Sequence, residues 1–126
     1  MGFSAEVYGE KTIYVSVDNE WTQLDSSLCH IPIKEVSDFE NFISTGRSKM
    51  LIPGNPEKLL ILKERLENLI GDKAVIFTSK PYFLEILSSN CGKGEALEFL
   101  AKKLNVHIEQ TMSFGDSMND ETMMKK

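Results

Sequence analysis

The stretch from Phe114 to Asp120 constrains this chain most, because it sets two carboxylates and an amide on a tight loop between a short apolar run and a helix start. Thr111 to Phe114 is typical of a short strand, and Gly115 permits a sharp exit from it. Asn119 or Asp120 is suited to cap the helix that follows. The carboxylates then lie at the C-terminal edge of a strand, where open α/β sheets bind ligands. The pattern predicts an α/β fold with a site for a hard cation and an anionic substrate at this loop.

Two other interpretations of this loop are considered. Gly, Asp, Ser and Asn are ordinary turn and cap residues, so a purely structural loop remains an alternative. Asp116 and Asp120 also have the spacing of alternate ligands in a calcium-binding loop. Met118 stands between them, however, and Glu121 occupies the place of the turn glycine, so the calcium loop is rejected.

Charge and cysteine content limit the partners. Nineteen acidic and fourteen basic residues give a net charge of −5, which disfavours nucleic acid and anionic membranes as partners. Cys29 and Cys91 lie far apart and show no zinc-ligand spacing, so reduced thiols are expected. No secretory signal and no membrane-length apolar run occurs. We expect a cytoplasmic protein.

Residues 3–87 predict an antiparallel sheet covered on one face by helices, an α+β arrangement. The alternation of Ile13, Val15 and Val17 is typical of a half-buried strand, and Gly9 lies in the turn before it. The expected elements are strands at 3–8, 12–17 and 50–52, a helix from Asp18 or Asn19 to before Pro32, a short helix capped by Ser37, a long helix that Asn55 and Pro56 begin and Gly71 ends, and a hairpin of 73–78 with 82–87.

From Cys91 onward the pattern changes to a helix followed by the strand of Thr111 to Phe114. The helix opens at Gly92-Lys93-Gly94 and carries an apolar stripe of Leu97, Leu100, Ala101 and Leu104. A lysine in the first turn opposes the helix macrodipole, whereas an anion there is favoured by both the lysine and the helix. Lys93 is therefore a candidate phosphate or carboxylate ligand, with a solvated surface lysine as the alternative.

The spaced pair of Gly92-Lys93-Gly94-x-Ala96-Leu97 and Phe114-Gly115-Asp116-x-x-Asn119-Asp120 resembles the third and fourth motifs of the haloacid dehalogenase-like superfamily. The resemblance is to its Cof-type sugar-phosphate phosphatases and covers nearly the whole chain, including the Ser79-x-Pro81-Tyr82-Phe83 hairpin of the cap. It implies a cap domain at residues 1–89 and an incomplete Rossmann-like core segment at residues 90–126.

The resemblance also implies site roles. Lys93 and Asp116 are the expected catalytic residues, Lys93 and Asn119 the phosphate or substrate ligands, and Asp116 and Asp120 the ligands of a Mg²⁺ cofactor. The implied activity is magnesium-dependent hydrolysis of a small phosphorylated metabolite such as a sugar phosphate. Catalysis of phosphoryl transfer is mostly positioning and electrostatics. It therefore needs a cation such as the Lys93 ammonium and a metal ion such as Mg²⁺ to balance the charge of the phosphoryl group.

The chain departs from the family in one respect, because the nucleophile motif Asp-x-Asp-x-Thr does not occur in it. Asp18 to Thr22 has one aspartate and the final threonine but lacks the second aspartate. We therefore expect a fragment that is inactive alone, with self-association through the incomplete core segment. The alternatives are a non-catalytic binding module, and a phosphomutase or trehalose-phosphate-type phosphatase.

Specificity in such enzymes is set by cap side chains that face the core, and the sequence does not orient them. Tyr8, Arg47, Lys49 and Tyr82 are candidates by their chemistry, and Arg47 and Lys49 are candidates to meet a second anionic group. The alternative for both cations is a solvated surface.

Overall fold

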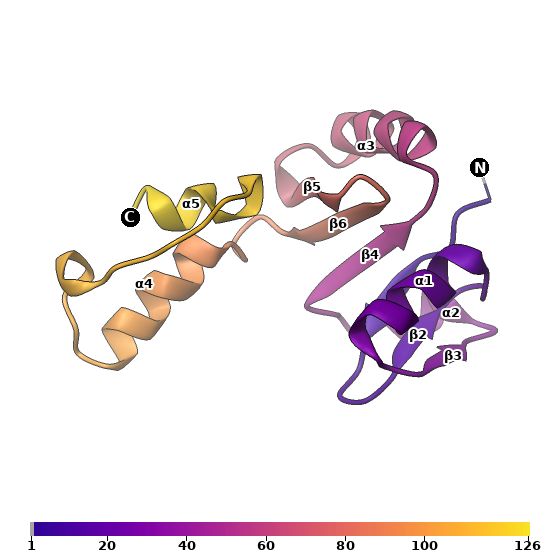
Figure 1. The fold of residues 1–126 in the computed structure, drawn as a ribbon, viewed down its shortest axis with the longest axis horizontal. Coiled ribbons are helices and arrows are strands. Elements are labelled where there is room, and N and C mark those ends of the chain that lie inside the picture. Colours follow the sequence, from indigo (N-terminus) through magenta and orange to yellow (C-terminus); the bar gives the residue numbers. More distant parts are fainter. Residues whose placement is uncertain (1) are drawn as a thin grey trace.

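The computed structural model describes residues 2–126, and in this part of the chain six strands form one sheet in the order β3-β2-β1-β4-β6-β5 (Figure 1). The strands are β1 (Glu6–Tyr8), β2 (Ile13–Val15), β3 (Ile33–Glu35), β4 (Lys49–Pro53), β5 (Ala74–Lys80) and β6 (Phe83–Ser88). The helices are α1 (Glu20–Cys29), α2 (Phe39–Ile43), α3 (Pro56–Ile70), α4 (Lys93–Lys103) and α5 (Glu121–Met124), with 3-10 turns η1 (Gly71–Lys73), η2 (Ile108–Gln110) and η3 (Met118–Asp120). None of the helices in residues 2–126 has the length and apolar character needed to span a membrane.

Side-chain caps start α1 and α3 where the sequence predicts them. The Asn19 Oδ1 atom accepts from the backbone N–H groups of Trp21 and Thr22 at 2.9 and 3.1 Å, which begins α1. Asn55 caps α3 in the same way, with Pro56 in the first helical position. The predicted cap at Ser37 is wrong, because Asp38 caps α2 by accepting from the Asn41 N–H.

The two predicted hairpins are confirmed, but the sheet is mixed and not wholly antiparallel. β1 pairs antiparallel with β2, and β5 pairs antiparallel with β6. For β3 the sequence predicts only an optional strand without bounds, and it pairs parallel with β2, placing Tyr14 beside Lys34. Two charged residues in a three-residue strand give little sequence signal, so this strand depends on its neighbour for its hydrogen bonds.

The helices lie on both faces of the sheet, which corrects the prediction of one covered face. β2 and β4 run in the same direction because each is antiparallel to β1. The β2-α1-β3 crossover proceeds toward one edge of the sheet, and the β4-α3-β5 crossover proceeds toward the other. Right-handed crossovers in opposite directions place their helices on opposite faces. α1 therefore covers one face at β1 and β2, while α3 covers the other face at β4, β6 and β5.

The main core lies between α3 and the β4-β6-β5 part of the sheet. Its buried members are Ile52, Leu59, Ile76 and Leu84. Ile52 pairs with Leu84 in register, so both point to the α3 face, where Leu59 of the helix meets them. The opposite face of these three strands is not covered by a helix of the sheet body. That open face is turned toward the segment after Asn90.

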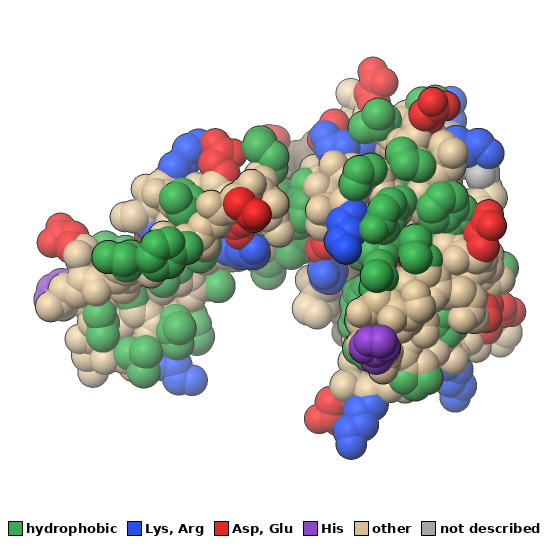
Figure 2. All heavy atoms as spheres, in the orientation of Figure 1, with side chains coloured by type: hydrophobic (Ala, Val, Ile, Leu, Met, Phe, Trp, Pro, Cys, Tyr) green, Lys and Arg blue, Asp and Glu red, His purple; other side chains and the backbone are tan. Residues whose placement is uncertain are grey.

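The segment after Asn90 forms a smaller body beside the sheet, reached directly from the end of β6 (Figure 1). The space-filling view shows a hollow between the two bodies (Figure 2). The predicted strand at Thr111 to Phe114 is wrong, because these residues have no strand hydrogen bonds among residues 2–126. A strand needs a paired neighbour, and no strand of the sheet runs beside this segment. Its apolar residues are left exposed, including Phe114 at 81%.

Candidate active site

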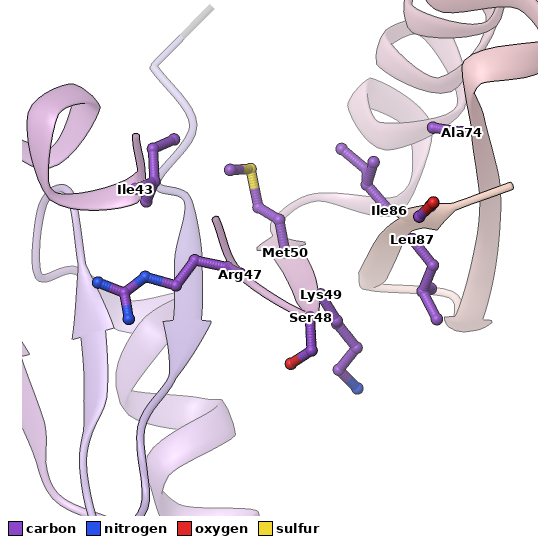
Figure 3. A pocket seen from close by; sticks show the side chains of 9 residues that line it. Ile43, Arg47, Ser48, Lys49, Met50, Ala74, Ile86 and Leu87 are labelled. Carbon is purple, nitrogen blue, oxygen red and sulfur yellow. The ribbon is translucent and has the colours of Figure 1, made fainter. Parts of the chain in front are cut away.

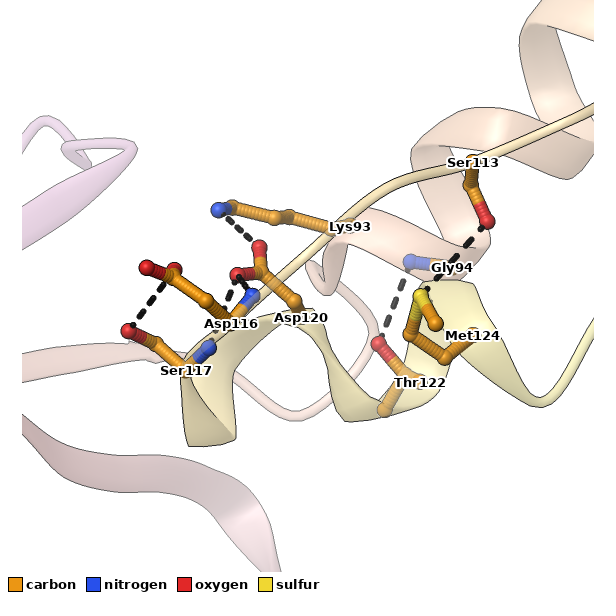
Figure 4. Close-up of polar contacts among 8 residues, drawn as sticks. All are labelled: Lys93, Gly94, Ser113, Asp116, Ser117, Asp120, Thr122 and Met124. Atoms are coloured by element: carbon orange, nitrogen blue, oxygen red, sulfur yellow. Dashed lines mark hydrogen bonds and ion pairs between the residues drawn. The ribbon is translucent and has the colours of Figure 1, made fainter.

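Lys93 and Asp120 form an ion pair that joins the start of α4 to the loop before α5 (Figure 4). Lys93 is the first residue of α4, and Asp120 is the last residue of η3. The Asp120 side chain is buried, whereas half of the Lys93 side chain is exposed. The fold therefore brings together the two predicted motifs and leaves the ammonium group accessible to an anion.

Asp120 also organises the loop on which Asp116 lies. Its Oδ2 atom accepts from the backbone N–H groups of Asp116 and Ser117, each at 3.2 Å. The hydrogen bond from Lys93 and these two N–H groups hold the pKa of the Asp120 carboxyl below its usual value, although burial opposes the shift. Both oxygens of Asp120 are thus engaged within the protein. Its assignment as a metal ligand remains a prediction.

Asp116 is the carboxylate of this loop that is open to a cation. Its side chain is exposed, and its Oδ1 atom accepts only a long hydrogen bond of 3.3 Å from the Ser117 hydroxyl. Asn119 lies two residues beyond Ser117, with a buried Oδ1 atom that has no hydrogen-bond partner among residues 2–126. A buried unpaired amide oxygen is costly, which makes Asn119 a candidate ligand-binding residue.

Two glycines allow the close approaches that build the site. A Cβ atom on Gly94 would lie 2.5 Å from the backbone oxygen of Thr122, so a side chain there would push α5 away from α4. The Gly94 N–H donates to the Thr122 hydroxyl at 3.1 Å in this contact. A Cβ atom on Gly115 would lie 2.3 Å from the Asp120 Cβ atom. Both motif glycines are therefore required by packing, and the loop keeps its shape only with them.

A cavity of about 620 Å³ separates Lys93 from the open face of the sheet. Five side chains of that face line it, and strand register places them together: Lys49, Val75, Phe77, Glu85 and Leu87. Lys93, Asn119 and Met118 line the opposite side. A cavity of this size between two bodies, with apolar walls and a few convergent polar groups, is typical of a small-molecule site. A second cavity of about 760 Å³ opens at Asp116 below Thr78 and Ser79 of β5.

The structure orients the four candidate specificity residues. Lys49 lines the cavity on the side opposite to Lys93, and Arg47 points in a different direction from Lys49 (Figure 3). Arg47 lies 4.2 Å from the centre of the Phe42 ring and donates to the Phe42 carbonyl, so it belongs to α2 and not to the cavity. Tyr8 donates to Asp25 at 2.6 Å, and Tyr82 packs edge-on against Phe83.

Sequence reasoning missed Glu85, which lines the cavity from β6. The alternation of β6 contains the signal, because Glu85 lies between the apolar residues Leu84 and Ile86 and therefore on the face opposite to theirs. Which face meets the active site is not readable from that alternation.

The residues of the loop fit a magnesium site that is completed by other ligands. Among residues 2–126 no three His, Cys, Asp or Glu side chains cluster as a metal site. Magnesium is commonly held by one or two carboxylates while waters and substrate phosphate oxygens fill the remaining positions. Asp116 is exposed, and its N–H donates to the Asp120 that pairs with Lys93, so it supplies a carboxylate oxygen of that kind.

Comparisons with known proteins identify the family of this chain. The sequence profile of the haloacid dehalogenase-like hydrolases matches residues 1–126. An HMP-PP phosphatase of Yersinia pestis is 33% identical over 92 residues, which cover 73% of this chain and 34% of that protein. A crystal structure of a haloacid dehalogenase-like hydrolase from Bacteroides thetaiotaomicron superposes with a TM-score of 0.84 at 28% identity, covering 98% of this chain and 47% of the other.

A crystal structure of a protein from Thermotoga maritima superposes with a TM-score of 0.81 at 30% identity, again covering 98% of this chain and 47% of the other. The chain thus spans less than half the length of each of these three proteins. Every part of it falls within the matched region of the family profile. The chain therefore belongs to the haloacid dehalogenase-like hydrolase family, and its resemblance to the Cof-type members is confirmed.

Proposed function

We propose that this chain supplies the cap and part of the active site of a magnesium-dependent phosphatase that acts on a small phosphorylated metabolite such as a sugar phosphate. The cap corresponds to residues 1–89 and the partial core to residues 90–126. The observation that carries the proposal is that Asp120 joins the half-exposed Lys93 to the loop of the exposed Asp116, by pairing with the Lys93 ammonium and accepting from the Asp116 N–H. The similarity to an HMP-PP phosphatase supports a phosphorylated substrate.

Each site residue then has a distinct task. Lys93 neutralises negative charge on the phosphoryl group, and Asp120 fixes both the Lys93 head and the Asp116 loop. Asp116 holds the magnesium ion, which when bound balances the charge of the phosphoryl oxygens. Asn119 accepts a hydrogen bond from the substrate through Oδ1, which satisfies its unpaired buried oxygen.

The chain alone is expected to be inactive, because covalent phosphoryl transfer needs a carboxylate nucleophile and no Asp-x-Asp-x-Thr strand occurs in these 126 residues. A longer protein that joins this chain to such a strand should hydrolyse an aryl phosphate with magnesium and stop when EDTA is added. Release of nitrophenol from p-nitrophenyl phosphate measures both. Turnover by the purified chain that Asp116→Ala removes would contradict the first expectation, and a magnesium-independent longer protein would contradict the second.

We also propose that the segment after Asn90 associates with a second copy of the chain when nothing else covers it. Leu100 and Leu104, which belong to the apolar stripe of α4 and its C-cap, are 51% and 63% exposed. Covering side chains of this size is worth about 1.5–3 kcal/mol each. Light scattering over a concentration series should show dimers that Leu100→Glu disrupts. Leu69→Glu, at an 82% exposed position on α3, is the matched control. A monomer at every concentration would refute this proposal.

A further inference from the structure

The two lysines that line the cavity between the bodies are both already paired with carboxylates. Lys49 Nζ lies 3.0 Å from Glu85 Oε2, and Lys93 pairs with Asp120. Glu95 and Glu121 are further acidic residues of the lining. The Glu95 carboxylate folds back over Gly92 at the start of α4. The cavity therefore offers one accessible cation at the phosphate end, and it carries no excess positive charge elsewhere.

The Lys49–Glu85 pair is held in a fixed place on the sheet. Lys49 on β4 is opposite Leu87, two residues beyond Glu85 on β6, so the two charged side chains are diagonal neighbours on one face. The Lys49 and Glu85 side chains are 34% and 13% exposed. The Lys49 Nζ atom also lies 5.2 Å from the centre of the Tyr8 ring, and Asp25 fixes that ring by its hydrogen bond to the hydroxyl. The ammonium group is thus restrained from two sides.

The surroundings of this pair are apolar. Val75, Phe77 and Leu87 share its face of the sheet and its cavity. An anionic group that entered here would lose its hydrating water next to the Glu85 carboxylate. Among residues 2–126, Lys49 is the only cation on the sheet side of the cavity lining, and Glu85 already pairs with it. Repulsion between this anionic group and the Glu85 carboxylate disfavours binding, and the apolar side chains of the cavity provide no compensating hydrogen bonds.

We propose that Glu85, by holding Lys49, excludes a second anionic group from this cavity, so that the preferred substrate is a monophosphate whose leaving group is uncharged. Hydroxyl or amide groups of such a leaving group meet both members of the Lys49–Glu85 pair, and its apolar side lies on Phe77. This inference rests on the proposed phosphatase function. It assigns to the sheet face a selection against bisphosphates.

The test is a titration of the ¹⁵N-labelled chain, in magnesium, with glucose 6-phosphate and glucose 1,6-bisphosphate, which differ only by the second phosphate. Amide shifts at Gly92 to Gly94 report the phosphate end, and those at Glu85 and Leu87 report the sheet face. The wild-type chain should bind the monophosphate about tenfold more tightly than the bisphosphate. Glu85→Gln frees Lys49 and should move the ratio of the two affinities about tenfold toward the bisphosphate.

Two further variants separate charge from structure. Lys49→Met leaves the carboxylate alone in the cavity and should move the ratio in the opposite direction, whereas loss of structure would move it the same way in both variants. Glu67→Gln breaks the comparable pair with Lys63 on α3 and should leave the ratio unchanged.

Three outcomes would contradict the proposed selection against bisphosphates. Equal or tighter binding of the bisphosphate by the wild-type chain overturns the inference. Shifts at Gly92 to Gly94 without shifts at Glu85 and Leu87 overturn it too, but leave the proposed function standing. No shift at either end with either ligand overturns both.

Discussion

Replacing Lys93 by alanine is expected to lower kcat/KM by about 10²–10³-fold in a protein that joins this chain to an Asp-x-Asp-x-Thr strand. The variant loses the cation that faces the phosphoryl group, and it also releases Asp120 from its ion pair. Because Asp120 holds the backbone of Asp116 and Ser117, the metal-binding loop loses part of its support as well. Asp116→Ala should be similarly severe, because it removes the exposed carboxylate of the loop.

Steady-state kinetics with a series of magnesium concentrations measure these effects. Lys63→Ala is the matched control, because it removes a lysine that pairs with Glu67 on α3, away from the cavity, and such a surface pair contributes about 1 kcal/mol or less. Lys93→Ala and Asp120→Ala should be non-additive when combined, since each breaks the same pair. A Lys93→Ala enzyme with unchanged kcat/KM would refute the proposed role.

The candidate site was predictable because each of its two motifs is short, and the residues of each motif are recognisable by their spacing in the sequence. Lys93 and Asp120 lie 27 residues apart and form a direct ion pair in the structure. The different roles of Asp116 and Asp120 were not predictable. They depend on which carboxylate oxygens accept hydrogen bonds within the protein, and here those are the oxygens of Asp120. Lys49 and Arg47 were equivalent candidates by composition, and only the register of β4 against β6 separates them.

The fold was predictable where local signals suffice and not where pairing decides. The Asn19 and Asn55 caps determine their helices from within a few residues. The strand at Ile33–Glu35 forms only because β2 lies beside it and supplies its hydrogen bonds. The apolar run at 111–114 remains irregular because, among residues 2–126, no strand lies beside it. The covered faces follow from strand order, which long-range pairing sets.

A buried acid on β1 was also missed, because a glutamate in a strand is usually on the solvent side. Glu6 has 0% exposure, and neither of its carboxyl oxygens has a hydrogen-bond partner among residues 2–126. Burial is the largest cause that raises its pKa, followed by the negative charge of Asp25 on α1, and the pKa reaches about 9. α1 covers the face of β1 on which Glu6 lies beside the buried Val15, so Glu6 has no route to water. The folded protein therefore holds Glu6 protonated at neutral pH.

Glu6→Gln is expected to stabilise the fold above pH 5, increasingly as the pH rises. The unfolded chain releases the Glu6 proton near the usual value of 4.5, whereas the folded chain keeps it until about 9. The wild-type protein therefore has its full stability below pH 4.5 and loses stability between pH 4.5 and 9. Glutamine has the same shape and no charge to lose, and its amide can donate to the Asp25 carboxylate. The gain at pH 8 should be about 1–3 kcal/mol after solvent screening.

Urea unfolding of both proteins from pH 5 to pH 8.5 tests this expectation. The difference in unfolding free energy should grow steadily across that range, because only the wild-type chain carries the linked proton. Glu57→Gln, at an exposed position in the first turn of α3, is the control and should show no growing difference. If wild type and Glu6→Gln keep a constant difference from pH 5 to pH 8.5, Glu6 is ionised within the fold. An ionised Glu6 carboxylate would then need a hydrogen-bond donor, and we would expect that donor on α1.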